Sequence, residues 1–99
     1  MKLYTLYKSS LSTKKYDVYI ENPDTGRTKK ISFGAKNYED YTIHKDKDRR
    51  EKYRSRHSKD NINNPMYPGF WSWHVLWGES TNIKTAMRNA VHLAKLYLL

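Results

Sequence analysis

The chain contains no cysteine, and glycine, proline and phenylalanine are scarce, with four, three and two copies in 99 residues. Without cysteine the protein has no disulfide framework and no thiolate metal site, a composition that fits a reducing compartment. No apolar run approaches the roughly 18 residues that a membrane-spanning helix needs. The start MKLYTLYKSS also lacks the apolar stretch of a secretory signal peptide. We therefore expect a protein that has no membrane span and is not secreted.

Acidic residues are also scarce, because 19 Lys and Arg face only 10 Asp and Glu, which leaves a net charge of +9. Residues 27–59 carry twelve of the basic residues and five of the acidic ones, so seven of the nine net charges lie there. The length predicts a single domain spanning residues 1–99. The charge predicts a polyanionic partner.

Three segments have the composition of β-strands. Residues 1–7 alternate loosely and predict a short N-terminal strand, followed by a polar loop over 9–15. Tyr16–Ile20 and Lys29–Phe33 are rich in β-branched and aromatic residues, and the turn residues of 21–27 separate them. The pattern predicts a β-hairpin in which alternate residues of each strand form an inner face and Gly34 ends the sheet.

The segment from His44 to His57, HKDKDRREKYRSRH, is the most polar part of the chain, with seven Lys or Arg, three acids and one aromatic, Tyr53. It predicts one helix that lies on the surface, because so polar a helix has no stripe to bury. The pairs Asp46–Arg50 and Asp48–Lys52 have i,i+4 spacing, but like-charge pairs of the same spacing offset them. Packed side chains or a polyanion must therefore hold this helix in place.

The segment Gly69–Trp77 contains all three tryptophans and predicts a short helix. Phe70, Trp73 and Trp77 share one face of such a helix and are predicted core residues, whereas Trp71 points away from that face.

The C-terminal residues predict a regular amphipathic helix, capped by Ser80 or Thr81 and running to about Leu98. Its apolar stripe comprises Ile83, Ala86, Met87, Ala90, Val91, Ala94, Tyr97 and Leu98. The chain as a whole predicts an α+β fold. A small antiparallel sheet, made of an N-terminal strand and a hairpin, packs with a basic helix, a short Trp-rich helix and this C-terminal helix.

The basic residues are candidates for contact with nucleic acid, since Lys and Arg neutralise phosphates and release counterions. The predicted contact residues are Lys29, Lys36, Lys45, Lys47, Arg49, Lys52, Arg54, Arg56 and Lys59. The alternative is a solvated face that keeps the protein soluble. Tyr38, Tyr41 and Tyr53 could stack on bases, although packing the helix onto the sheet is the favoured role.

The sequence contains few motifs that could bind a metal ion or carry out catalysis. His44 and Asp48 would share a helix face, but a zinc site needs three or four converging ligands, and basic residues surround this pair. A nuclease using Asp46 and Asp48 with His44 would need a carboxylate cluster and a metal ion that the chain does not supply. The sequence has no phosphate-binding loop, dinucleotide-binding turn or nucleophile motif. We therefore predict no metal, no cofactor and no enzymatic activity.

Several of these strings together resemble a known family. They are Phe33-Gly34-Ala35-Lys36, Tyr38 to Asp46 (YEDYTIHKD), Arg50, Tyr53, Arg56-His57, Pro68-Gly69-Phe70-Trp71-Ser72 and Leu76-Trp77. Over about residues 16–87 the chain resembles an uncharacterised family of small basic proteins encoded by large nucleocytoplasmic DNA viruses, relatives of the mimiviruses and chlorella viruses. The family pattern has a further basic residue where this chain has Trp73-His74.

The resemblance implies a viral protein located in the virion or in the cytoplasm or nucleus of an infected eukaryotic cell. Its aligned polar residues are expected to form a buried network that locks helix to sheet. They are His44, Asp46, Arg50, Tyr53 and His57.

Together these observations predict a non-enzymatic viral structural or accessory protein whose basic surface, residues 27–59, contacts DNA or RNA without sequence specificity, or an acidic viral protein. The alternative is a protein-interaction module, such as a minor capsid or scaffold piece, in which charge steers assembly. A metal-dependent nuclease is the weaker alternative. A homo-oligomer is compatible with each.

Overall fold

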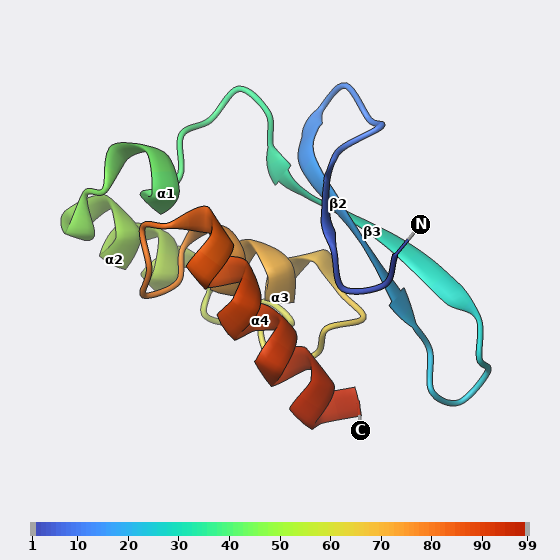
Figure 1. Cartoon of the computed structure of the whole chain (residues 1–99). Coiled ribbons are helices and arrows are strands. Elements are labelled where there is room, and N and C mark those ends of the chain that lie inside the picture. Colours follow the sequence, from blue (N-terminus) through green and yellow to red (C-terminus); the bar gives the residue numbers. More distant parts are fainter. Residues whose placement is uncertain (1, 99) are drawn as a thin grey trace.

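The computed structural model describes residues 2–98 and has the predicted α+β fold (Figure 1). Three strands form an antiparallel sheet in the order β1-β2-β3. The strands are β1 (Leu6–Lys8), β2 (Lys14–Glu21) and β3 (Thr28–Ala35). The helices are α1 (Tyr41–His44), α2 (Lys47–His57), α3 (Pro68–Trp71), the π-helix η1 (Ser72–Leu76) and α4 (Ile83–Leu98).

The predicted hairpin is confirmed as β2 and β3. Val18 pairs with Ile31 in the register of the two strands, and both side chains are buried on the face that meets the helices. Gly34 does not end the sheet but lies inside β3 with a φ of 81°. A Cβ at this position would stand 2.7 Å from the Leu76 side chain, so glycine allows η1 to approach the sheet closely.

The first strand is shorter than predicted and begins later. Tyr4 has a φ of 57°, which interrupts any extended run through residues 1–7. β1 therefore contains only Leu6–Lys8, and Met1 lies outside the described residues. The predicted loop over 9–15 is also shorter, because Lys14 already belongs to β2.

A buried carboxylate on β2 anchors that loop. Asp17 accepts hydrogen bonds from the hydroxyls of Ser9, Ser10 and Ser32 and from the backbone N–H of Ser10. Burial raises the pKa of Asp17, but these hydrogen bonds outweigh burial and hold its pKa below the ordinary value.

The prediction for the tryptophan segment was wrong about which tryptophan lies deepest. Trp71 is fully buried, its indole N–H donates to the Pro65 carbonyl at 2.8 Å, and it packs in the core with Phe70. Trp77 is only partly buried and packs against that core from outside. Phe70 and Trp73 are 2% and 9% exposed, so the prediction that these two residues belong to the core is confirmed.

The physical reason is the π-helix. Its backbone bond from the Trp77 N–H to the Ser72 carbonyl spans five residues, so equivalent positions recur more slowly than in an α-helix. The buried residues of this segment are Phe70, Trp71, Trp73, Val75 and Leu76. Burial recurs after five residues, from Phe70 to Val75 and from Trp71 to Leu76, which fits the wider turn.

Helix α4 matches the prediction along most of its length. Its buried residues are Ala86, Met87, Ala90 and Ala94, whereas Tyr97 is exposed. The cap is Asn82 rather than Ser80 or Thr81, since the Asn82 side chain accepts hydrogen bonds from the N–H groups of Lys84 and Thr85. No helix within residues 2–98 is long and apolar enough to cross a membrane.

The charged segment forms two helices rather than one from His44 to His57. Lys45 ends α1 in the left-handed conformation with a φ of 57°. The next residue, Asp46, begins α2 by accepting hydrogen bonds from the N–H groups of Asp48 and Arg49. The sequence predicted that Asp46 forms an i,i+4 ion pair with Arg50. Asp46 acts instead as the N-cap of α2, so a new helix begins at this residue.

Candidate functional site

A cleft of about 600 Å³ lies where the hairpin meets the helices. One wall is the end of the hairpin away from its turn, with Lys14 and Lys15 from β2 and Gly34 from β3. Helix α2 forms the opposite wall, and Trp77, directly after η1, also lines the cleft. We call this feature the basic cleft.

The side chains that line the basic cleft are predominantly cationic. They include five cations and two carboxylates. The cations are Lys14, Lys15, Arg49, Lys52 and Arg56, and the carboxylates are Glu39 and Asp40. The lining therefore has an excess of three positive charges, which favours an anionic occupant.

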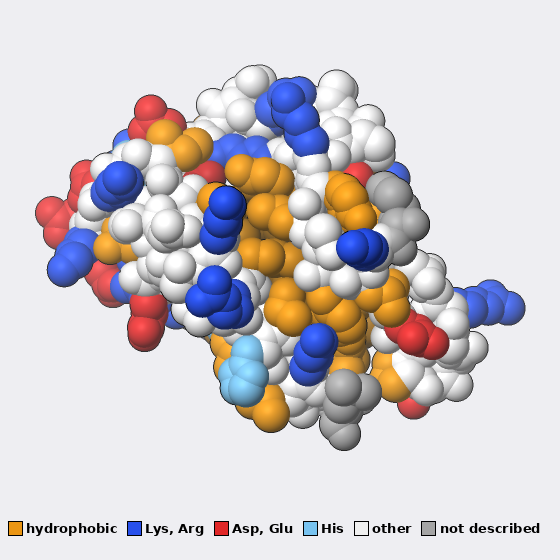
Figure 2. Space-filling view, in the orientation of Figure 1, with side chains coloured by type: hydrophobic (Ala, Val, Ile, Leu, Met, Phe, Trp, Pro, Cys, Tyr) orange, Lys and Arg blue, Asp and Glu red, His pale blue; other side chains and the backbone are white. Residues whose placement is uncertain are grey.

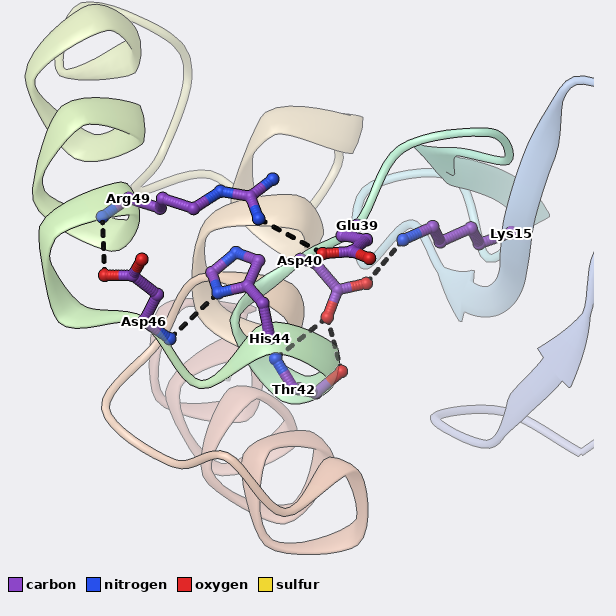
Figure 3. Close-up of polar contacts among 7 residues, drawn as sticks. All are labelled: Lys15, Glu39, Asp40, Thr42, His44, Asp46 and Arg49. Atoms are coloured by element: carbon purple, nitrogen blue, oxygen red, sulfur yellow. Dashed lines mark hydrogen bonds and ion pairs between the residues drawn. The ribbon is translucent and has the colours of Figure 1, made fainter.

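One cation of the cleft is held in a buried ion pair. Lys15 Nζ lies 2.6 Å from Asp40 Oδ2, and only 12% and 3% of the two side chains are exposed. Asp40 also accepts hydrogen bonds from the Thr42 N–H and the Thr42 hydroxyl, so one carboxylate caps α1 and binds β2 (Figure 3). This pair connects helix to sheet at the cleft.

A second cation has a weaker partner at the surface. Arg49 Nη1 lies 3.1 Å from Glu39 Oε2, and about half of each side chain is exposed to solvent (Figure 3). Exposed pairs of this kind contribute roughly 0–1 kcal/mol, so Glu39 can be displaced by a stronger anion. Within residues 2–98, Lys14, Lys52 and Arg56 form no ion pair with a carboxylate.

Aromatic rings from α1, from α2 and from the residue after η1 pack in succession, and we call them the ring column. They are His44, Trp77, Tyr53 and His57. Tyr53 stacks on His57 with centroids 4.2 Å apart and on Trp77 with centroids 4.3 Å apart. His44 also contacts Trp77, with ring centroids 5.3 Å apart and planes tilted by 52°. Neighbouring rings therefore cover both faces of Tyr53, which has no free face for a base. Burial raises the pKa of Tyr53 above its ordinary value.

The predicted buried network of five polar residues does not form. Arg50 donates from Nε to the Gly78 carbonyl at 2.7 Å and pairs with Glu51, not with Asp46. His57 binds Asp60 at 2.7 Å, and Tyr53 contributes its ring to the column. Arg50, Tyr53 and His57 therefore each have a partner outside the predicted set.

His44 and Asp46, the other two residues of the predicted network, contact each other at the break between α1 and α2. His44 Nδ1 accepts the Asp46 N–H at 2.9 Å, and this contact selects the tautomer whose single ring proton is on Nε2. His44 Nε2 is buried and has no hydrogen-bond partner among the described residues. The Asp46 carboxylate caps α2, so His44, Asp46 and the exposed Asp48 are not arranged as metal ligands. Within residues 2–98, no three His, Asp or Glu side chains converge on one point.

Three of the nine predicted nucleic-acid contacts line the basic cleft, and four others are exposed outside its lining. Arg49, Lys52 and Arg56 line the basic cleft. The exposed residues outside its lining are Lys36, Lys45, Lys47 and Lys59.

Two of the nine have partners inside the protein. Arg54 lies 4.4 Å above the Trp73 ring and is half-buried, because α2 turns this position inward. Lys29 donates to the Met66 carbonyl at 2.7 Å, near the start of β3 and away from the cleft.

The sequence did not predict a site role for two lysines of the cleft, and it favoured a packing role for a third residue of the lining. Lys14 and Lys15 were assigned to a loop outside the basic region, and Tyr38 was expected to pack the helix, yet 74% of it is exposed at the cleft. The sequence signal that could have pointed to Lys14 and Lys15 is a pair of adjacent lysines at the start of a strand. Nothing local in the sequence places them opposite α2.

The comparisons with known proteins bear on the same region. The model of a family of unknown function, DUF5754, matches residues 4–57, which include the sheet, α1 and α2. No curated protein and no solved structure matches the chain. Because the matched residues make up more than half of the chain and include all five cations of the basic cleft, the protein belongs to the DUF5754 family of unknown function.

Proposed function

We propose that the protein is a non-enzymatic nucleic-acid-binding protein that holds a phosphate backbone in the basic cleft. The observation that carries this proposal is the placement, on opposing walls, of three cations that form no ion pair with a carboxylate of residues 2–98. Lys14 stands on β2, and Lys52 and Arg56 stand one turn apart on α2. A strand of phosphates between these walls would meet cations from both sides.

Such binding depends on phosphate charge and reads little sequence. Each neutralised phosphate releases counterions, so three cations predict a log–log slope of affinity against salt of about −2 for a single strand. The cleft presents no set of side-chain amides with which to recognise base edges, so we expect similar affinity for mixed sequences.

The test is fluorescence anisotropy with labelled oligonucleotides across a salt series. Lys52→Glu combined with Arg56→Glu should reduce affinity by more than about tenfold and flatten the salt slope. The matched control is Lys47→Glu combined with Lys59→Glu, which changes the net charge equally outside the cleft lining. Equal loss in both double variants would mean that overall charge, not the cleft, attracts the ligand.

The setting of this activity stays a prediction. The resemblance to proteins of large DNA viruses supports a role in a virion or in an infected cell. Mass spectrometry of purified particles and fractionated host cells would test it.

A protein-interaction module is the second candidate, and the surface of α4 favours it. Leu93, Leu96 and Tyr97 are 41%, 67% and 57% exposed on this helix. Figure 2 shows hydrophobic side chains gathered between α4 and the sheet, with separate Lys and Arg side chains around them. Sedimentation equilibrium tests self-association through this surface: Leu96→Lys should shift a dimer to monomer, and a parent that stays monomeric excludes the homo-oligomer.

A further inference from the structure

We propose that the basic cleft selects single-stranded over duplex nucleic acid, because Tyr38 offers its ring to an unpaired base. This inference rests on the proposed function and names its ligand class. It begins from a difference between Tyr38 and the other aromatic residues of the cleft.

Tyr38 is the ring that no neighbour covers. It lines the cleft, 74% of it is exposed, and no other ring or cation of residues 2–98 stacks on it. Tyr53, in contrast, is stacked between His57 and Trp77. A flat ligand that enters the cleft can therefore stack on Tyr38 without displacing another ring.

The backbone holds Tyr38 beside the cations. Its N–H donates to the Ala35 carbonyl at 3.2 Å, which forms a turn directly after β3. Two residues later Asp40 is fixed by its buried pair with Lys15. The chain around Tyr38 is thus fastened at both ends, and the ring is presented at the cleft at a small cost in backbone entropy on binding.

The two kinds of nucleic acid differ in what they offer to this arrangement. Both present phosphates to Lys14, Lys52 and Arg56. Only a single strand also presents an unpaired base face, because the bases of a duplex are stacked and paired inside it. Stacking of a base on an aromatic side chain changes affinity by roughly 5- to 150-fold. The cations therefore supply binding to either form, and Tyr38 supplies the preference.

The experiment compares one mixed-sequence DNA strand with the same strand annealed to its complement, by fluorescence anisotropy at equal salt. The wild-type protein should bind the single strand at least about fivefold more tightly. Tyr38→Ala should remove that preference by weakening single-strand binding alone, with duplex affinity and salt slope unchanged. Tyr38→Phe, which keeps the ring, should retain the preference. Because Tyr38 is exposed, both variants should melt like the parent.

The outcomes separate this inference from the proposed function. Salt-dependent binding with equal or greater affinity for the duplex overturns the single-strand preference and leaves the proposed function standing. Loss of the preference in Tyr38→Phe as well as in Tyr38→Ala overturns the stacking role. Absence of binding to either form at low salt overturns the proposed function and the inference together.

Discussion

Tyr53 and Trp77 stack with their ring centroids 4.3 Å apart and their planes within 5° of parallel. Tyr53 belongs to α2, which has no fully buried residue, and Trp77 follows η1, whose buried side chains pack in the core. The stack is therefore a principal attachment of a very polar helix to the rest of the protein. A helix with so little apolar surface depends on the few rings it has.

The first prediction concerns this attachment. Tyr53→Ala should lower the free energy of unfolding by roughly 3 kcal/mol, because it removes a ring packed on both faces. Urea denaturation followed by tryptophan fluorescence measures the change. Tyr53→Phe keeps the rings in contact and should retain most of the stability. If the two variants unfolded alike, the stack would not be what holds α2.

The second prediction concerns the buried ion pair of Lys15 and Asp40. Asp40→Asn should cost about 3–5 kcal/mol, because it leaves the Lys15 ammonium without its counter-ion in a largely buried position. The control is the neighbouring change Glu39→Gln, which breaks an exposed pair and should cost less than about 1 kcal/mol. Thermal melting compares the two variants directly, and similar melting temperatures would contradict the role assigned to Asp40.

The third prediction uses the same Glu39→Gln variant in binding. It releases Arg49 and removes a negative charge from the basic cleft, so affinity for single-stranded DNA should rise and the salt slope should steepen by about 0.7. Glu51→Gln makes the same chemical change outside the cleft lining and should have a smaller effect. A rise of the same size in Glu51→Gln would assign the effect to net charge alone.

The fourth prediction concerns pH. Burial lowers the pKa of His74, and the positive charge of Arg54 lowers it further. The hydrogen bond to the Ile62 carbonyl raises this pKa but does not outweigh burial. The pKa of His74 in the folded protein therefore lies below the ordinary 6.5. The unfolded chain therefore binds this proton more readily than the folded one. The free energy of unfolding should be highest above pH 6.5 and should fall as pH decreases through the folded-state pKa.

The matched variant for this prediction is His74→Gln, whose amide N–H can still donate to the Ile62 carbonyl. Urea denaturation of both proteins between neutral pH and about pH 5 gives the difference. The parent should lose more stability than the variant on acidification. Parallel pH profiles would mean that other groups account for the loss.

Local patterns in the sequence determined much of the fold. Alternation of apolar residues predicted the hairpin of β2 and β3, and the repeat from Ile83 to Ala94 predicted α4. Both patterns arise from the geometry of a single element, so neighbouring residues are sufficient to reveal them. The inward position of Arg50 was also predictable, and 15% of its side chain is exposed.

Only the tertiary structure decided which tryptophan is buried and where the basic cleft lies, whereas the break in the charged helix follows from a local contact that the sequence pattern did not reveal. The π-helix lengthens the spacing at which residues return to the same face of a helix. Asp46 caps α2 instead of forming an ion pair within a single longer helix. The cleft unites Lys14 with Lys52, which are 38 positions apart in the chain. Their approach follows from the packing of the hairpin, the ring column and the Lys15–Asp40 pair, and contacts between distant elements leave no periodic trace in a single sequence.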